Sequence, residues 1–234
     1  ISEDYGRVTK GMALAVRAHV HMLAASPLFN GNTLYASIRN DDGTPLFPQE
    51  YQHDKWKRAA DAVKDIFDLG VYSLYRQNNE DGTLDPFMSY MNIHFATGLN
   101  NPELIFINNN CNYAEADQNM APHGYGDGNG AYGATQNLVD AFFTRNGLPI
   151  DKDPSYVAEG YSTEDVYYSN TSWTRSNSKE VKGLVTEAGT PNMYCNREPR
   201  FYVSVLWHGE WSTQLEGYVD FLYGGANGGP SYDS

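Results

Sequence analysis

The 234-residue chain is long enough to bury a hydrophobic core in one or two domains. Its 29 acidic and 16 basic side chains give a formal net charge of −13, and no Lys/Arg cluster breaks this excess. The charge argues against nucleic acid and anionic lipid headgroups as direct partners. The chain has 18 Tyr and 4 Trp, an excess of Asn and only 19 % charged residues. Aromatic rings stack on sugar faces, and Asn and Asp side chains hydrogen-bond to hydroxyls, so this composition favours a sugar-like ligand.

Two amphipathic helices are expected near the start of the chain. In residues 6–25 apolar side chains recur at helical spacing, and Pro27 ends the helix. The segment from Lys55 repeats this pattern, and its helix is expected to end at Gly70. Both segments are rich in Ala, whose small side chain lets helices pack closely, so the pair is typical of a tetratricopeptide-like hairpin. We expect residues 1–75 to form this hairpin.

Residues 76–234 are expected to form a loop-rich ligand-binding region with short helices and a little β structure. Residues 103–107 read as a short buried strand, and residues 108–133 as a long Gly/Asn/Tyr loop of a length that is usually functional or disordered. Thr135 can cap a helix that ends near residues 146–147. After a weakly patterned polar stretch at 148–192, the β-branched and aromatic residues 201–207 favour a strand, with a turn at 208–210.

The long loop carries the candidate ligand-binding residues. An aromatic ring offers a flat apolar face to a sugar, while amide and imidazole groups fix the orientation of the ligand. The candidates are Tyr113, Tyr125, Tyr132, Asn110, Asn112 and His123. The alternative is that these side chains simply pack the loop.

Motifs for catalysis, cofactors and metals are weak, so no catalytic residue and no cofactor are expected. Residues 128–133 spell GxGxxG, but no predicted strand precedes them, as a dinucleotide site requires. Glu115 and Asp117 lie in the long loop, which is a poor scaffold for a glycosidase carboxylate pair. The Asp-rich turns lack the EF-hand spacing, so calcium is not indicated. Cys111 and Cys195 belong to no CxxC pair, which leaves one long-range disulfide open.

Five blocks of the sequence span most of the chain. They are GRVTKGMALAVRAHVHMLAASPLFNG at 6–31, KWKRAADAVKDIFDLGVYSLY at 55–75, NPELIF at 101–106, TQNLVDAFFTRNG at 135–147 and NREPRFYVSVLWHGEW at 196–211. In sequence and in order these blocks resemble the SusD/RagB family of Bacteroidetes surface lipoproteins.

The resemblance implies a mostly α-helical, SusD-like fold with tetratricopeptide-like hairpins. It also implies non-enzymatic capture of an oligosaccharide or polysaccharide at the extracellular face of the outer membrane, for delivery to a SusC-like TonB-dependent transporter. The lipid anchor is then expected outside residues 1–234, which we interpret as an internal fragment. Family members tend to place sugar-stacking aromatic residues between the NPE-type segment and the TQN-type helix, here residues 108–132. Two alternatives remain: capture of peptide, as in the RagB branch, and a scaffold subunit without a ligand of its own.

Overall fold

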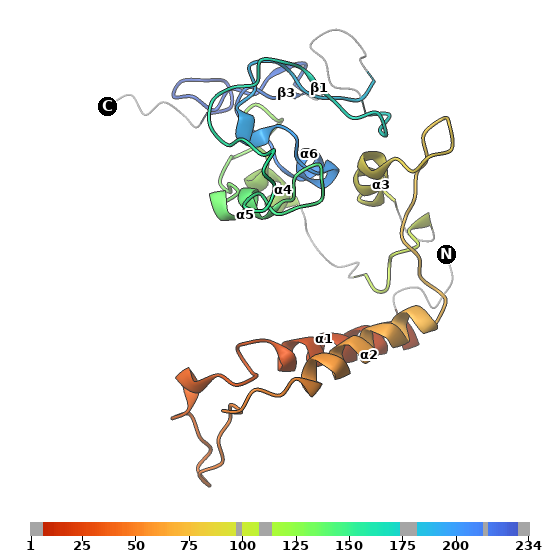
Figure 1. The fold of residues 1–234 in the computed structure, drawn as a ribbon, viewed down its shortest axis with the longest axis vertical. Helices are drawn as coiled ribbons and strands as arrows, with labels where there is room; N and C mark the ends of the chain where they lie inside the picture. Colours follow the sequence, from red (N-terminus) through yellow and green to blue (C-terminus); the bar gives the residue numbers. More distant parts are fainter. Residues whose placement is uncertain (1–6, 97–99, 108–113, 174–181, 213–214, 229–234) are drawn as a thin grey trace. The chain divides into compact units, whose positions relative to one another are not determined.

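The computed structural model describes residues 7–96, 100–107, 114–173, 182–212 and 215–228 (Figure 1). The chain separates into two compact units, one made of Ile1–Leu74 and Thr97–Asn110, the other of Tyr75–Ala96 and Cys111–Ser234. In the described parts helices of six to sixteen residues alternate with loops, while the strands have only two or three residues. The prediction that helices dominate over short strands is confirmed.

The first unit is built on α1 (Lys10–Ala25) and α2 (Asp54–Asp68), which lie side by side in Figure 1. The helices run antiparallel, because Gly11 at the start of α1 faces Tyr72 beyond the end of α2, and a Cβ atom at Gly11 would overlap the Tyr72 ring. Small side chains form the contact, as the sequence predicts. The buried residues of the two helices are Gly11, Ala18, Ala25, Ala59 and Ala62.

Local hydrogen bonds fix both ends of this hairpin. The Thr9 side chain caps α1 by accepting a hydrogen bond from the backbone N–H of Met12 at 3.1 Å. The chain between the helices includes the short 3₁₀ helix η1 (Thr33–Tyr35). There the buried Asn30 amide accepts from the N–H of Gln52 at 2.8 Å and donates to the Gln52 carbonyl at 3.1 Å. These two bonds join the chain leaving α1 to the chain entering α2.

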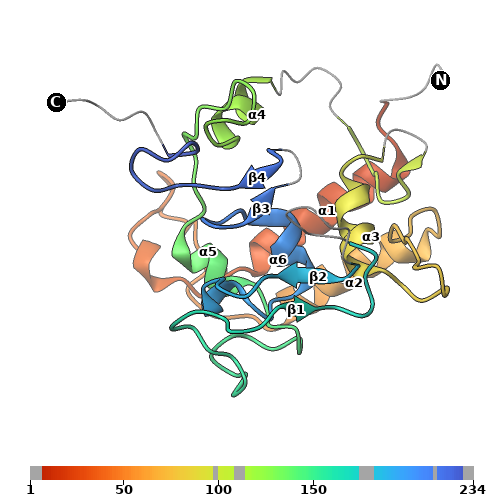
Figure 2. The same cartoon turned by 90° about the horizontal axis from the view of Figure 1, so that it is seen from above.

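The described part of the second unit contains four short helices, a 3₁₀ turn and two small antiparallel sheets. The helices are α3 (Pro86–Ile93), α4 (Ala114–Met120), α5 (Gln136–Ala141) and α6 (Pro199–Ser204), and the turn is η3 (Asn192–Tyr194). Strand β1 (Val166–Tyr167) pairs with β2 (Leu184–Thr186), and β3 (Trp211–Ser212) pairs with β4 (Gly217–Tyr218), as Figure 2 shows. The buried core of this unit is Phe87, Val139, Tyr168, Val185, Phe201, Tyr202, Val205 and Trp207.

The strand predicted over residues 201–207 is wrong, because this segment begins within α6. Pro199 suits the first turn of a helix, where its missing N–H costs nothing. Phe201 is 0 % exposed and Tyr202 4 % exposed, so packing into the core decides the local structure against the strand propensity of the segment. The chain becomes extended only at Val205, with φ −119° and ψ 127°.

Other local predictions had mixed outcomes. Thr135 caps α5 as predicted, accepting from the Leu138 N–H at 3.3 Å, but the helix ends at Ala141 rather than near residues 146–147. Residues 103–107 contain no strand. The stretch 148–192 instead supplies β1 and β2, and the long loop begins with α4.

A buried arginine ties α6 to the rest of the core. Arg197 is 0 % exposed, and its guanidinium donates to the carbonyl oxygens of Val139, Phe142 and Met193 at 2.5–2.9 Å. The guanidinium also lies over the Phe201 ring, 4.9 Å from its centre. These contacts hold the start of α6, and with it residues 204–206, against the end of α5.

Candidate ligand-binding site

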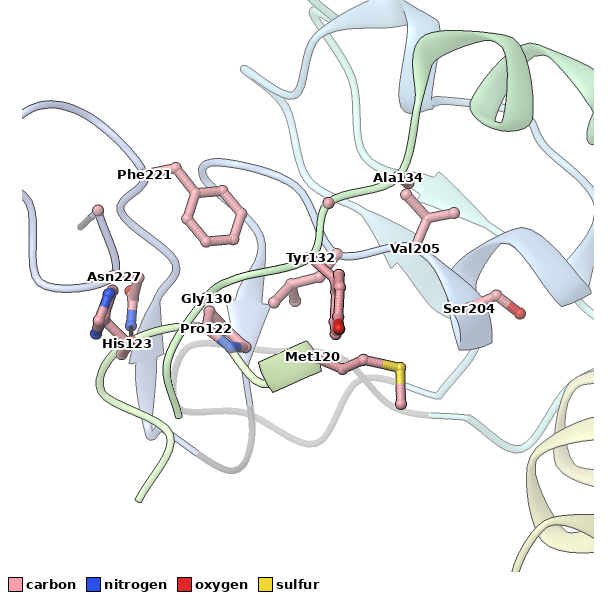
Figure 3. A pocket seen from close by; sticks show the side chains of 13 residues that line it. Met120, Pro122, His123, Gly130, Tyr132, Ala134, Ser204, Val205, Phe221 and Asn227 are labelled. Atoms are coloured by element: carbon pink, nitrogen blue, oxygen red, sulfur yellow. Dashed lines mark hydrogen bonds between the residues drawn. The ribbon is translucent and has the colours of Figure 1, made fainter. Parts of the chain in front are cut away.

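A cavity of about 460 Å³ opens in the second unit (Figure 3). Its walls come from the loop after α4, from the chain at the end of α6 and from the loop at 221–228. The volume falls within the range of about 300–1,000 Å³ that is usual for small-molecule sites. The cavity is lined by Met120, Pro122, His123, Gly130, Tyr132, Gly133, Ala134, Ser204, Val205, Leu206, Phe221, Asn227 and Gly228.

Two aromatic rings reach this cavity from segments far apart in the sequence. Tyr132 is 66 % exposed and Phe221 is 40 % exposed, and Figure 3 shows them on different parts of the wall. Met120 adds a flexible apolar side chain that is 59 % exposed. Exposed rings at the mouth of a polar loop region are suited to stack on the apolar face of a ligand ring.

Backbone hydrogen bonds fold the loop after α4 back onto that helix. The N–H groups of residues 129–132 donate to carbonyl oxygens of residues 118–121 at 2.7–3.1 Å. Gly128 makes this close approach sterically feasible, because a Cβ atom there would overlap the carbonyl oxygens of Ala121 and Pro122. The position of the Tyr132 ring is therefore set by an ordered backbone.

The opposite wall is fastened through Asn227, which is 5 % exposed. Its side-chain Nδ2 donates to the His123 carbonyl at 2.6 Å, and its Oδ1 accepts from the Asp220 N–H at 2.9 Å. The Phe221 N–H donates to Nδ1 of His208 at 3.1 Å. The first of these bonds joins the loop of residues 220–228 to the loop that carries Tyr132, and the other two fasten the base of the 220–228 loop.

The predicted binding residues have different positions in the structure. His123 and Tyr132 line the cavity. Tyr125 is half-buried and is not among the lining residues, and its hydroxyl donates to Ser212 Oγ at 2.6 Å. The remaining three predicted residues, Tyr113, Asn110 and Asn112, lie outside the described residues.

Sequence reasoning missed Phe221 and Asn227. Residues 221–228, FLYGGANG, have the same mixture of aromatic, Gly and Asn residues that singled out the long loop. This signal was available in the composition of the segment. That the two segments share one cavity could not be read from the sequence, because they lie about 90 residues apart.

The carboxylates of Glu115 and Asp117 and the thiol of Cys195 do not line the cavity. In the described segments no three or more His, Cys, Asp or Glu side chains are grouped so that they could hold a metal ion. Glu115 and Asp117 lie in the first turn of α4, rather than in an irregular loop. Among the described residues Cys195 is a buried free thiol, and burial raises the pKa of this thiol. Its candidate partner Cys111 lies outside the described residues.

A comparison with protein-family models decides the family. Residues 97–233 match the model of the SusD family, which is more than half of the chain and includes the whole described cavity. The chain belongs to the SusD family. In this SusD-family chain no helix within the described residues is long and apolar enough to cross a membrane.

Solved structures support the predicted SusD-like fold. Two structures, titled BT4246 and selenomethionine BT4246, match with TM-scores of 0.59 and 0.53, each at 24 % identity. They align with 87 % and 85 % of this chain, which spans 37 % of the length of each. At this identity the likeness shows the fold alone. A search of curated proteins gives no match.

Proposed function

We propose that the chain is part of a non-catalytic surface protein that binds a glycan and delivers it to a SusC-like TonB-dependent transporter in the outer membrane. Membership of the SusD family supports the nutrient-binding role. The observation that carries the proposal for this chain is the cavity whose mouth presents the exposed rings of Tyr132 and Phe221. The ligand would stack on these rings, while polar groups near His123 would fix its orientation.

The pair Tyr132 and Phe221 gives the direct test. Replacing both residues with Ala removes the two ring faces, and each ring is expected to contribute about 1–3 kcal/mol of binding free energy if it stacks on the ligand. We expect the double variant to bind its best glycan at least tenfold more weakly in isothermal titration against a panel of glycans and peptides. Tyr223→Ala is the matched control, because this ring is 86 % exposed but does not line the cavity.

Three outcomes would overturn parts of this proposal. If the double variant binds the glycan as tightly as the wild type, the cavity is not the glycan-binding site. Turnover of a glycan by the purified protein, lost in Glu115→Gln, would replace binding by catalysis. Tight binding of peptides with no response to glycans would favour the peptide-capturing role of the RagB branch.

A scaffold role is the second candidate, and it rests on the first unit. The helices α1 and α2 leave apolar side chains such as Val16, Val20 and Phe67 between 54 % and 74 % exposed, a surface suited to protein contacts. Under this reading the chain would bind the transporter and the cavity would have no ligand. Co-purification with the transporter that survives Tyr132→Ala and Phe221→Ala, with no glycan binding by the wild type, would favour the scaffold.

A further inference from the structure

A second cavity, of about 400 Å³, lies in the same unit and takes no part in the site described above. Its walls come from residues 161–167, from Asn192 and Asn196, and from Arg145. The polar stretch 148–192, which the sequence marks only as weakly patterned, supplies most of this wall. Unlike the first cavity, this one is lined almost entirely by charged, amide and hydroxyl groups, with two tyrosines among them.

The cationic side of the cavity is held in place. The backbone N–H of Arg145 donates to the Asn196 carbonyl at 2.8 Å, and its Nη1 donates to the Asn196 side-chain oxygen at 3.2 Å. The guanidinium also lies 4.7 Å from the centre of the buried Tyr168 ring. Arg145 is itself exposed, so guanidinium N–H groups beyond the one bonded to Asn196 face solvent.

The facing segment is equally ordered. The N–H of Ser162 donates to the Thr190 carbonyl at 2.8 Å, and residues 166–167 pair with β2. Asp165 accepts from the Ala188 N–H at 2.9 Å through one carboxylate oxygen and from the Tyr167 hydroxyl at 3.3 Å through the other. Asn192 Nδ2 donates to the Glu159 carbonyl at 2.7 Å. Polar groups that are fixed before a ligand arrives lose little entropy when it binds.

The charges of the lining select the class of ligand. An anion would meet the carboxylates of Glu164 and Asp165, while a cation would meet the guanidinium of Arg145. A neutral polyhydroxyl compound avoids both penalties, since each hydroxyl can donate to a carboxylate or amide oxygen and accept from a guanidinium or amide N–H. Tyr161, 70 % exposed, and Tyr167, 47 % exposed, add ring faces on which a sugar can stack.

We propose that this second cavity binds a neutral oligosaccharide, separately from the first cavity. The inference rests on the proposed glycan-binding function and adds to it a second point of contact. Two sites on one unit would let the protein hold a polymer at two places, which raises the overall affinity without a tighter single site.

Chemical-shift mapping by NMR on the isotope-labelled full chain tests this inference. The probes are maltohexaose, xylohexaose and mannohexaose as neutral sugars, and tetragalacturonic acid as the acidic one. We expect at least one neutral hexaose to shift the amide signals of residues 161–167, 192 and 196. Tyr161→Ala should weaken this binding roughly tenfold while leaving the shifts at the first cavity unchanged, and Tyr132→Ala should do the reverse.

The outcomes separate the inference from the function on which it rests. Shifts confined to residues of the first cavity overturn the second site and leave the glycan-binding function standing. Stronger shifts at the second cavity with tetragalacturonic acid than with any neutral hexaose overturn the neutral class. No shift at either cavity with any probe overturns both proposals together. Because Tyr161 is exposed, unchanged signals elsewhere in the spectrum of Tyr161→Ala establish that the variant is folded.

Discussion

Arg197 is the residue on which the second unit most depends. Its buried guanidinium satisfies three backbone carbonyl oxygens, and its backbone N–H donates to the Tyr202 hydroxyl at 3.1 Å. Burial raises the pKa of the neighbouring Tyr168 hydroxyl to about 12, so this phenol stays protonated and donates to the Arg197 carbonyl. The two tyrosines and the arginine therefore form one hydrogen-bonded group inside the core.

Arg197→Met should strongly destabilise the protein. The substitution removes the guanidinium donors of three carbonyl oxygens, at a cost of about 1–3 kcal/mol for each oxygen left without a partner in the core. The Met193 oxygen keeps the Tyr156 hydroxyl as a donor at 3.4 Å. We expect the free energy of unfolding, measured by urea titration with fluorescence detection, to fall by about 3 kcal/mol or more. Arg200→Met is the control, because Arg200 is exposed and its ion pair with Glu198 should contribute less than about 1 kcal/mol. Equal effects of the two substitutions would contradict the role assigned to Arg197.

Asp85 makes stability depend on pH. This carboxylate is fully buried, which raises its pKa, but hydrogen bonds from Met88, Ser172 and Thr171 outweigh burial and leave the pKa below its usual value. A lowered pKa in the folded state contributes stability that is present above the unfolded pKa of about 4 and is lost as the pH falls through the folded value.

Asp85→Asn should therefore reduce stability at pH 7 and lose this disadvantage in acid. Unfolding measured at pH 7, 5 and 3 is expected to give a difference between wild type and variant that shrinks at pH 3, because below a pH of about 4 the unfolded wild type takes up a proton at Asp85 more readily than the folded protein does. A difference that stays constant over this range would show that the ionised form of Asp85 is not what stabilises the fold.

At the scale of elements, the loop after α4 depends on one glycine. Gly128→Ala should push residues 129–132 away from the helix, since the added Cβ overlaps two carbonyl oxygens. We expect a loss of about 1–3 kcal/mol in the free energy of unfolding, as for other overpacked sites. Gly133→Ala is the control, because a Cβ at that position meets no atom within 4 Å. Similar stability of the two variants would mean that the loop is not held against α4.

The elements that the sequence predicted well are those whose local signals agree with their surroundings. Helices α1 and α2 have clear apolar periodicity, and Thr135 provides a standard cap for α5. The sequence predicts a strand at α6 because its β-branched and aromatic residues favour extended structure. In the structure the adjacent side chains of Phe201 and Tyr202 are both buried in the core, which the helix allows and an alternating strand does not. The short helix α3 is stabilised mainly by Asp85 and by packing of Phe87 against Trp173, contacts between distant parts of the sequence.

The candidate site was predictable only in part, because it too depends on contacts between distant parts of the sequence. Composition pointed to the loop that carries His123 and Tyr132, but no local signal joined this loop to Phe221 or Asn227. The connection depends on the Asn227 side chain and its bond to the His123 carbonyl across 104 positions of the chain. A cavity whose walls come from distant segments becomes visible only when the chain is folded.

For the whole molecule, the net charge of −13 sets the response to salt. Repulsion among surplus carboxylates destabilises the compact state, and added salt screens it. We expect the thermal unfolding midpoint to rise by a few degrees between about 10 and 200 mM NaCl, measured by differential scanning fluorimetry. The affinity for a neutral glycan should stay nearly constant over this range. A steep fall in affinity with salt would indicate that the ligand is charged.

The loop of residues 220–228 is held by hydrogen bonds at its base and has exposed side chains at its tip. Asp220, Asn227 and the Phe221 backbone make the bonds that hold it, while Leu222 and Tyr223 are 62 % and 86 % exposed. The side chains at positions 222 and 223 can therefore be exchanged, while Gly224 and Gly225 are kept, because Gly224 has a φ of +76° and a Cβ at Gly225 would overlap Asp220. The tip of the loop is a natural place for grafting, where new side chains can be added next to Phe221 at the first cavity while the scaffold is kept.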